Sequence, residues 1–255
     1  MQQQRRLFLA SIAIAATALI TNTAQAGWDW NWGSGERIKG TGDVSSETRD
    51  PGAFDGVSMT GGFKVLIRQA STNKVEIKAD KNLLPYLETK VVEGSHGRTL
   101  EVGVKKGYSI SSTVTPQLVL DMPQLRLVSV SGSGDVKVEP MKTGAVEVSI
   151  SGSGDLKFDQ LQSERLGISV SGSGDVRGSG KTGQLKVSVA GSGDVKLRGM
   201  EAEEAKVSIA GSGDAEINAT RKLSISVAGS GDVAYVGSPE ISTSIAGNGK
   251  VKKLN

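Results

Sequence analysis

One four-residue motif recurs along the second half of the chain at a nearly constant interval. Gly-Ser-Gly-Asp occurs six times, and an altered seventh copy, Gly-Asn-Gly-Lys, begins at Gly247. The intact copies begin at Gly132, Gly152, Gly172, Gly191, Gly211 and Gly229, so successive copies are 18 to 20 residues apart. A unit this short cannot bury an apolar face by itself, and such units stack on their neighbours to build a shared core.

The residues on both sides of each motif alternate between apolar and polar. Val128-Ser129-Val130-Ser131 precedes the first copy, and Val136-Lys137-Val138 follows it. This period of two is typical of β-strands, and the paired glycines indicate a bend. We therefore predict an all-β fold, a single-stranded parallel β-helix or β-solenoid with coils of about 18–20 residues. The usual hand of parallel crossovers predicts a right-handed solenoid. The alternatives are a propeller, whose blades need about 40 residues each, and a meander of hairpins.

The alternation also assigns residues to the two faces of each strand. Val128, Val130, Val136 and Val138 should point into the core. The serines between such residues should stack as an outward column, formed by Ser129, Ser149, Ser169, Ser188, Ser208, Ser226 and Ser244. The variable stretches, such as 139–144 and 198–204, are expected to form the loops that close the coils.

The six motif aspartates are the sharpest chemical feature: Asp135, Asp155, Asp175, Asp194, Asp214 and Asp232. Stacked about 4.8 Å apart, two such charges repel by about 1 kcal/mol in water and by about 3.5 kcal/mol at an effective dielectric constant of 20. Cations two residues further on should lie beside them, namely Lys137, Lys157, Arg177 and Lys196. We predict that ion pairs and hydrogen bonds from the turns offset the repulsion. Calcium binding is the alternative, although calcium-binding β-rolls repeat every nine residues and separate Gly from Asp.

The composition excludes several kinds of site. The chain has no cysteine and one histidine, His96, which lies in a polar turn. A disulfide framework, a structural zinc site and a cysteine nucleophile are therefore excluded, and a catalytic triad would need His96. The carboxylates are repetitive rather than arranged as a distinct acidic pair. We predict no catalytic, metal-binding or cofactor-binding residue, and hence a protein that is not an enzyme.

The first 26 residues have the features of a signal peptide. Arg5 and Arg6 precede an apolar run over residues 7–20, and Ala24-Gln25-Ala26 forms a cleavage site. We predict export through the inner membrane to the periplasm, the outer envelope or the medium, with no transmembrane segment in the mature chain. The alternative is an N-terminal membrane anchor. Residues 27–255 would keep 28 basic and 27 acidic residues without a basic block, so nucleic-acid binding is not expected.

The mature chain divides into a tail and one domain. Residues 27–40 are expected to be a flexible tail that holds Trp28, Trp30 and Trp32, the three tryptophans of the protein. The alternative for these tryptophans is a stacking motif for sugars or a partner. Residues 41–255 should form the β-solenoid domain, with irregular coils to about 127 and repeat coils over 128–255. Within the irregular part, residues 63–67 and 75–79 are expected to pair as strands around a short loop, followed by a helical turn near Pro85.

One stretch of this irregular part supports a family resemblance. Gly62-Phe63-Lys64-Val65 through Asp80-Lys81-Asn82-Leu83-Leu84, followed by repeated Ser-Gly-Ser-Gly-Asp, resembles the family of the "putative auto-transporter adhesin, head GIN domain". The resemblance implies an exported β-solenoid that acts in adhesion, and it carries over no catalytic residue. The expected partner is an envelope or surface ligand, either a protein or a glycan. The alternatives are a structural envelope component and a polysaccharide-active β-helix enzyme.

The last copy of the repeat differs in charge from the others. Lys250 stands where the earlier copies have Asp, and Lys252 and Lys253 follow. Charged residues at the edge of a sheet discourage the addition of another strand. We therefore predict that this lysine-rich coil keeps the protein from stacking end to end.

Overall fold

The structure, a computed structural model, describes residues 35–94 and 97–254. The expected signal peptide, the three tryptophans and His96 lie outside these residues. Residues 35–255 belong to a single compact unit. Within the described part of the chain, no helix is long and apolar enough to cross a membrane.

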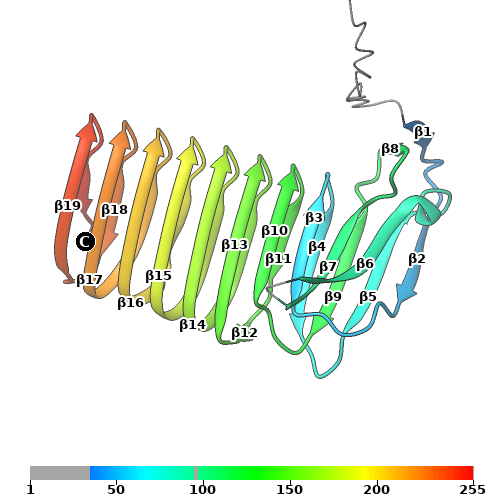
Figure 1. The fold of residues 1–255 in the computed structure, drawn as a ribbon, viewed down its shortest axis with the longest axis horizontal. Helices are drawn as coiled ribbons and strands as arrows, with labels where there is room; N and C mark the ends of the chain where they lie inside the picture. Colours follow the sequence, from blue (N-terminus) through cyan, green and yellow to red (C-terminus); the bar gives the residue numbers. More distant parts are fainter. Residues whose placement is uncertain (1–34, 95–96, 255) are drawn as a thin grey trace, which may run out of the picture. The chain divides into compact units, whose positions relative to one another are not determined.

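In the described residues that precede the repeat, the chain forms nine strands and one short helical turn (Figure 1). They are β1 (Glu36–Lys39), β2 (Val44–Arg49), β3 (Gly56–Thr60), β4 (Lys64–Gln69), β5 (Lys74–Asp80), the 3₁₀ turn η1 (Leu84–Tyr86), β6 (Leu87–Gly94), β7 (Gly97–Val104), β8 (Tyr108–Ser111) and β9 (Gln117–Met122). The turn η1 contains Pro85, so the expected short helical turn is confirmed.

Eleven strands make up the repeat. They are β10 (Leu127–Gly132), β11 (Asp135–Val138), β12 (Met141–Lys142), β13 (Ala145–Gly152), β14 (Leu156–Gly172), β15 (Val176–Gly191), β16 (Val195–Gly211), β17 (Ala215–Gly229), β18 (Val233–Val236), β19 (Glu240–Gly247) and β20 (Val251–Lys253). The long strands β14 to β17 each continue around most of a coil (Figure 1).

Successive coils pair in parallel and in register, which confirms the predicted solenoid. The strand segments that lead into each motif form one ladder, called here the leading ladder. It runs through β7, β3, β10, β13, the last parts of β14 to β17, and β19. The segments that follow each motif form the trailing ladder, which runs through β9, β4, β11, the first parts of β14 to β17, β18 and β20.

The motif glycines let the bends of successive coils come into contact. Gly152 has a φ of +119°, and a Cβ atom there would lie 2.5 Å from the carbonyl oxygen of Gly132. A Cβ atom on Gly154 would lie 2.5 Å from the carbonyl oxygen of Gly134 and 2.7 Å from Cγ1 of Val130. The first glycine is therefore required by conformation and by space, and the second by space alone.

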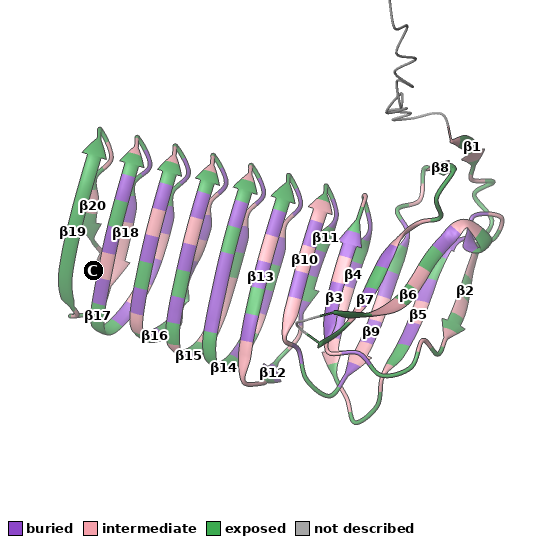
Figure 2. Ribbon diagram, viewed as in Figure 1, coloured by how far each residue is buried: buried purple, intermediate pink, exposed green. Residues whose placement is uncertain are grey.

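The apolar side chains meet inside the coils, as the alternation predicted. Val128, Val130 and Val138 have no exposed surface, and Val136 is 2% exposed. One core cluster runs from Phe54 to Val233, and buried and exposed residues alternate along the strands (Figure 2). The N-terminal strands and the repeat therefore share one hydrophobic core.

The stretches expected to close the coils as loops are largely extended. The stretch between a trailing segment and the next leading segment is called here the closing segment. In β14 to β17 the chain remains a strand through the closing segment. Register shifts, such as the one between Phe158 and Leu161, absorb the differences in length between coils. In the first repeat coil, β12 occupies part of the stretch expected as a loop. The expectation of loops is thus wrong for most coils, because a bulge accommodates one or two extra residues without ending the pairing.

The region before the repeat contains antiparallel pairs as well as parallel ones. The expected pairing of β4 with β5 is wrong, because β9 lies between them, parallel to β4 and antiparallel to β5. Strand β2 continues this group antiparallel to β5, and β6 pairs antiparallel with β7. The four-residue connection from β4 to β5 therefore crosses the end of β9, two strand spacings or about 10 Å.

Part of the expected tail is structured. Residues 36–39 form β1, which pairs in parallel with β8. The buried carboxylate of Asp80 holds the adjoining segment, because it accepts hydrogen bonds from the backbone N–H of Gly42, at 2.8 Å, and from the Ser112 hydroxyl. Asn82 adds a bond to the carbonyl oxygen of Lys39. These polar contacts depend on residues some 40 positions away, which local sequence patterns do not reveal.

Candidate interaction surfaces

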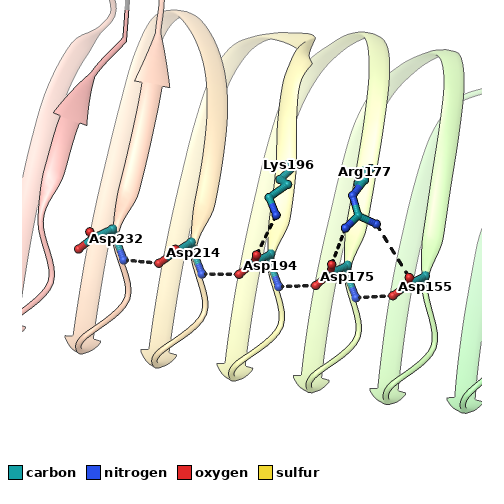
Figure 3. A network of polar contacts seen from close by, with 7 residues as sticks. All are labelled: Asp155, Asp175, Arg177, Asp194, Lys196, Asp214 and Asp232. Carbon is teal, nitrogen blue, oxygen red and sulfur yellow. Dashed lines mark hydrogen bonds and ion pairs between the residues drawn. The ribbon is translucent and has the colours of Figure 1, made fainter.

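Five of the motif aspartates, from Asp155 to Asp232, form a ladder in which each side chain accepts a hydrogen bond from the next coil (Figure 3). The Oδ1 atom of Asp155 accepts the backbone N–H of Asp175 at 3.0 Å, and Asp175 accepts that of Asp194 at 3.0 Å. The ladder continues from Asp194 to Asp214 at 3.1 Å and from Asp214 to Asp232 at 2.8 Å. Hydrogen bonding to the charged carboxylate offsets the repulsion within the column. The predicted bonds to backbone N–H groups are present, but they connect neighbouring coils.

Only some of the predicted ion pairs form within this ladder. Arg177 lies 2.7 Å from Asp175 and 3.9 Å from Asp155, and Lys196 lies 2.9 Å from Asp194. These two cations occupy the expected positions (Figure 3).

The other two predicted pairs are wrong. Lys137 and Lys157 both pair with Asp159, at 2.9 Å and 3.1 Å. Asp159 follows Lys157 by two residues and is half-buried near the end of the trailing segment, so it competes with the motif aspartates for both lysines. The sequence analysis did not single out Asp159, because an acidic residue follows the trailing strand in only two of the repeat coils, as Glu139 and Asp159.

Two carboxylates are held in the charged form by their partners. Hydrogen bonds from Lys137 and Lys157 lower the pKa of Asp159. For Asp194, burial raises the pKa, but the hydrogen bonds from Lys196 and from the backbone N–H of Asp214 outweigh it, so that the pKa lies below its usual value. Both groups are part of the scaffold, since each carboxylate already has two partners.

The geometry of the acidic groups bears on the calcium alternative. Among residues 35–94 and 97–254, no group of three or more histidine, cysteine, aspartate or glutamate side chains is placed to hold a metal ion. Along the ladder, one oxygen of each carboxylate from Asp155 to Asp232 already accepts an N–H group.

The predicted serine column stacks in register on the outside of the leading ladder. Ser129, Ser149 and Ser169 are aligned partners, and the column continues through Ser188 and Ser208 to the last coil. Each of these serines is half-buried or exposed. A second column of small residues lies beside the serine column, and most of its members are exposed. It consists of Ser131, Ser151, Ser171, Ala190, Ala210, Ala228 and Ala246. Along these two columns, the outside of the ladder is therefore a face of small side chains repeated at the strand spacing.

A groove of about 470 Å³ lies on the outside of the trailing ladder, where β9, β4, β11 and the first parts of β14 and β15 meet. Leu66 and Val119, which are aligned partners, are both half-buried there. Four cations surround this apolar pair: Lys64, Lys137, Lys157 and Arg177. The carboxylates of Asp135 and Asp155 line the same groove. The groove thus combines an apolar floor with charged walls in which cations outnumber carboxylates.

The sequence did not predict this groove. Val65, Leu66 and Ile67 form a continuous apolar run, which hides which of the three points outward. Register then aligns Leu66 with Lys137, the first outward cation of the repeat. The signal that could have found it is the second apolar run, Leu118-Val119-Leu120, in which the middle residue must also point outward.

A second groove, of about 520 Å³, lies at the start of the leading segments of coils β13 to β17. Its charged residues have both signs: Glu147, Arg165, Lys186, Glu204, Lys206 and Lys222. Arg221, next to this groove, pairs with Glu204. Mixed charges of this kind favour a polar partner over an apolar one.

The buried polar residues do not form a reactive cluster. Among the described residues, Asp80 and Thr182 are the buried polar or charged side chains. Asp80 holds the segment before β2, and the Thr182 hydroxyl donates to the carbonyl oxygen of Gln184. Both have structural partners, and they lie on different elements.

The repeated bends, the parallel ladders and the N-terminal strand group define the architecture of a known family. A family model described as "Putative auto-transporter adhesin, head GIN domain" matches residues 53–239. The chain belongs to this family. The resemblance found in the sequence is confirmed, and no curated protein matches the chain.

Solved structures share the fold of this head GIN domain. A putative adhesin from Bacteroides fragilis is similar with a TM-score of 0.78 and 22% identity, over 85% of this chain and 100% of that one. A putative lipid binding protein from Parabacteroides distasonis has a TM-score of 0.69 and 27% identity, over 86% and 100% of the two chains. A putative adhesin from Parabacteroides merdae has a TM-score of 0.65 and 22% identity over the same shares.

Proposed function

We propose that this protein is an exported, non-catalytic, adhesin-like protein that binds a ligand of the cell envelope or cell surface through the outer faces of its solenoid. Membership of the adhesin family supports the binding role, and the signal-peptide features of residues 1–26 support export. The site of action is the periplasm, the outer envelope or the surroundings of the cell.

One observation carries the proposal: the outside of the leading ladder repeats the same small polar side chains from coil to coil. Neighbouring serines of the column are one strand spacing apart, about 4.8 Å. Such a face offers many equivalent hydrogen-bonding positions to a ligand that is itself repetitive, such as a glycan. The described surface has few large aromatic anchors of the kind that dominate tight interfaces. Binding is therefore weak at each position and gains strength through multivalency.

Binding and turnover of purified residues 27–255 on whole cells and on neutral and acidic glycans test this proposal. We expect binding to cells or glycans without release of shortened products. Absence of binding to any of them would contradict the proposal and favour a structural envelope component. Turnover of a glycan that disappears after a change of one motif aspartate would favour the alternative of a polysaccharide-active β-helix enzyme.

The groove on the trailing ladder supports a second candidate function. Its apolar pair, Leu66 and Val119, lies among four cations and two carboxylates, and this excess of positive charge suits an anionic amphiphile. One similar structure is described as a putative lipid binding protein. Sedimentation with vesicles of phosphatidylglycerol, compared with phosphatidylcholine alone, tests it. Selective binding to the anionic vesicles that Leu66→Asp abolishes would support lipid binding, and equal or absent binding would exclude it.

A further inference from the structure

Strand β19 is the last strand of the leading ladder, and its core-facing side is uncovered. All eight of its residues are exposed. Ile241 and Ile245 are 40% and 42% exposed, whereas their aligned partners in β17, Leu223 and Val227, are buried. Within the described part of the chain, β19 pairs with β17 alone, so its other edge is free. A free edge with apolar residues on its inner face is a template for another strand.

The trailing ladder ends differently, because lysines occupy its last coil. Lys253 stands in a core-facing column, aligned with Tyr235 and, one coil earlier, with Ile217. Lys250 ends the aspartate ladder: its own N–H is accepted by Asp232 at 2.8 Å, but its side chain cannot accept the N–H of a further coil. A complete coil therefore cannot stack here without burying a lysine. A single strand that adds to β19 alone avoids this cost.

A second β19 strand is a poor partner for the free edge of β19, because it would bring a second set of lysines against the trailing ladder. The stretch Ile241-Ser242-Thr243-Ser244-Ile245 reads the same in both directions, so an antiparallel pair of β19 strands would match isoleucine with isoleucine. Such a symmetric pair also brings the two trailing edges together, where Lys250, Lys252 and Lys253 would face their own copies. Like charges that are directly opposite destabilise a strand pair.

Another segment of the chain has the required pattern. Trp28-Asp29-Trp30-Asn31-Trp32 alternates aromatic and polar residues with a period of two. Its tryptophans have the same spacing as Ile241, Thr243 and Ile245, the three core-facing positions of β19. In an extended segment the three indoles would share one face and cover those positions, while Asp29 and Asn31 would face outward. Asp29 also supplies a charge opposite to that of the nearby lysines.

The donor of this segment must be a second copy. Gly35 directly precedes Glu36, whose backbone N–H donates to the carbonyl oxygen of Gly107 at 2.9 Å. Gly107 follows β7, which is at the end of the ladder opposite β19 (Figure 1). Eight parallel pairings separate β7 from β19, which corresponds to about 38 Å. Trp32 is three residues before Gly35, and three extended residues span only about 10 Å. The segment of the same chain therefore cannot reach β19.

We propose that residues Trp28–Trp32 of one copy add as a strand to the free edge of β19 of a second copy and so join the molecules head to tail. The contact uses different surfaces on the two molecules, so it can repeat and extend a linear assembly. The proposal is independent of the ligand proposed above. The lysines of the trailing ladder restrict the contact to one strand.

The tryptophan fluorescence of residues 27–255 tests this proposal directly, because all three tryptophans lie in the donor segment. We expect the emission to shift to shorter wavelengths as the protein concentration rises, in parallel with growth of the sedimentation coefficient. The change Ile245→Lys should abolish both effects, since it places a charge on the acceptor face. The matched control is Ser244→Lys, which places the same charge on the outward face and should retain both. Thermal unfolding of each variant shows whether it is folded.

A second measurement supplies the segment separately. In W28S/W30S/W32S the only indoles come from an added peptide of residues 27–34, and we expect a blue shift of the peptide emission that Ile245→Lys prevents. Emission and sedimentation that do not change with concentration would overturn the proposal. Self-association that persists in W28S/W30S/W32S would also overturn it and would favour pairing of two β19 strands.

Discussion

At the scale of single residues, the glycines and aspartates of the motif act on the neighbouring coil rather than on their own turn. Gly152 and Gly154 leave room for the carbonyl groups of the preceding coil, and Asp155 accepts an N–H group from the following one. The inward valines could be predicted from the sequence because strand alternation alone determines them. The partners of the aspartates could not, because they depend on the register between coils.

The space at Gly154 leads to a first prediction. Gly154→Ala places a methyl group against the carbonyl oxygen of Gly134 and Cγ1 of Val130, so we expect a loss of about 1–3 kcal/mol or more in the free energy of unfolding. The matched control is Gly144→Ala, since a Cβ atom there has no neighbour within 4 Å. It should leave stability unchanged or raise it by up to about 1 kcal/mol. Urea unfolding measures both variants, and equal effects would contradict the stacking of the bends.

The lowered pKa of Asp194 leads to a second prediction, on the dependence of stability on pH. A carboxyl whose folded pKa lies below its unfolded pKa of about 3.9 stabilises the protein above that value. This stabilisation is lost as the pH falls from about 4 through the folded pKa. Melting temperatures between pH 6 and 3 should therefore decrease at the acidic end, and less steeply for Asp194→Asn. The control Glu203→Gln, at an exposed carboxylate, should follow the unmodified protein, and identical slopes for all three would refute this role of Asp194.

At the scale of elements, the repeat strands could be predicted closely and the N-terminal strands less well. The repeat offers several copies of each strand, so the pattern of faces is visible many times. By contrast, β9 inserts between β4 and β5 from a distant part of the sequence, and no local signal marks that insertion. The closing segments were mistaken for loops because bulges disturb their alternation while the pairing continues.

The lysines of the last coil lead to a third prediction. The triple change K250D/K252T/K253V restores the aspartate ladder and an apolar core-facing residue at the end of the trailing ladder. Coil-on-coil stacking should then become possible, and sizing experiments should detect large oligomers or aggregates. The same change combined with W28S/W30S/W32S should still associate, because this contact needs no donated strand. A triple variant no larger than the original protein would show that these lysines are ordinary solvated surface.

At the scale of the whole molecule, one continuous core lies within residues 53–239, the region that the family model matches, and strand pairing connects this region to β2, β19 and β20. This architecture follows from the repeat, which is why the fold class could be predicted from the sequence. Function could not be predicted to the same depth. The repeated residues mainly build the scaffold, and a ligand contacts whatever the scaffold leaves on its outer faces.

The satisfied aspartate ladder leads to a fourth prediction, on metal removal. If N–H groups and cations stabilise the carboxylates, EDTA should leave the melting temperature of residues 27–255 unchanged, and added calcium should not raise it. A ligand that binds only the folded state stabilises it by mass action. A fall of several degrees with EDTA that calcium reverses would therefore favour the calcium alternative.

The binding of whole cells by variants of the serine column tests the central claim most directly. Ser188→Arg with Ser208→Arg places two long side chains on the small-residue face of the leading ladder, and Gln162→Arg with Thr220→Arg adds the same charge at exposed positions of the closing segments. With both variants folded, we expect the first to lose binding and the second to retain it. Binding that survives in the first variant, or that is lost equally in both, would contradict a binding role for the repeated face.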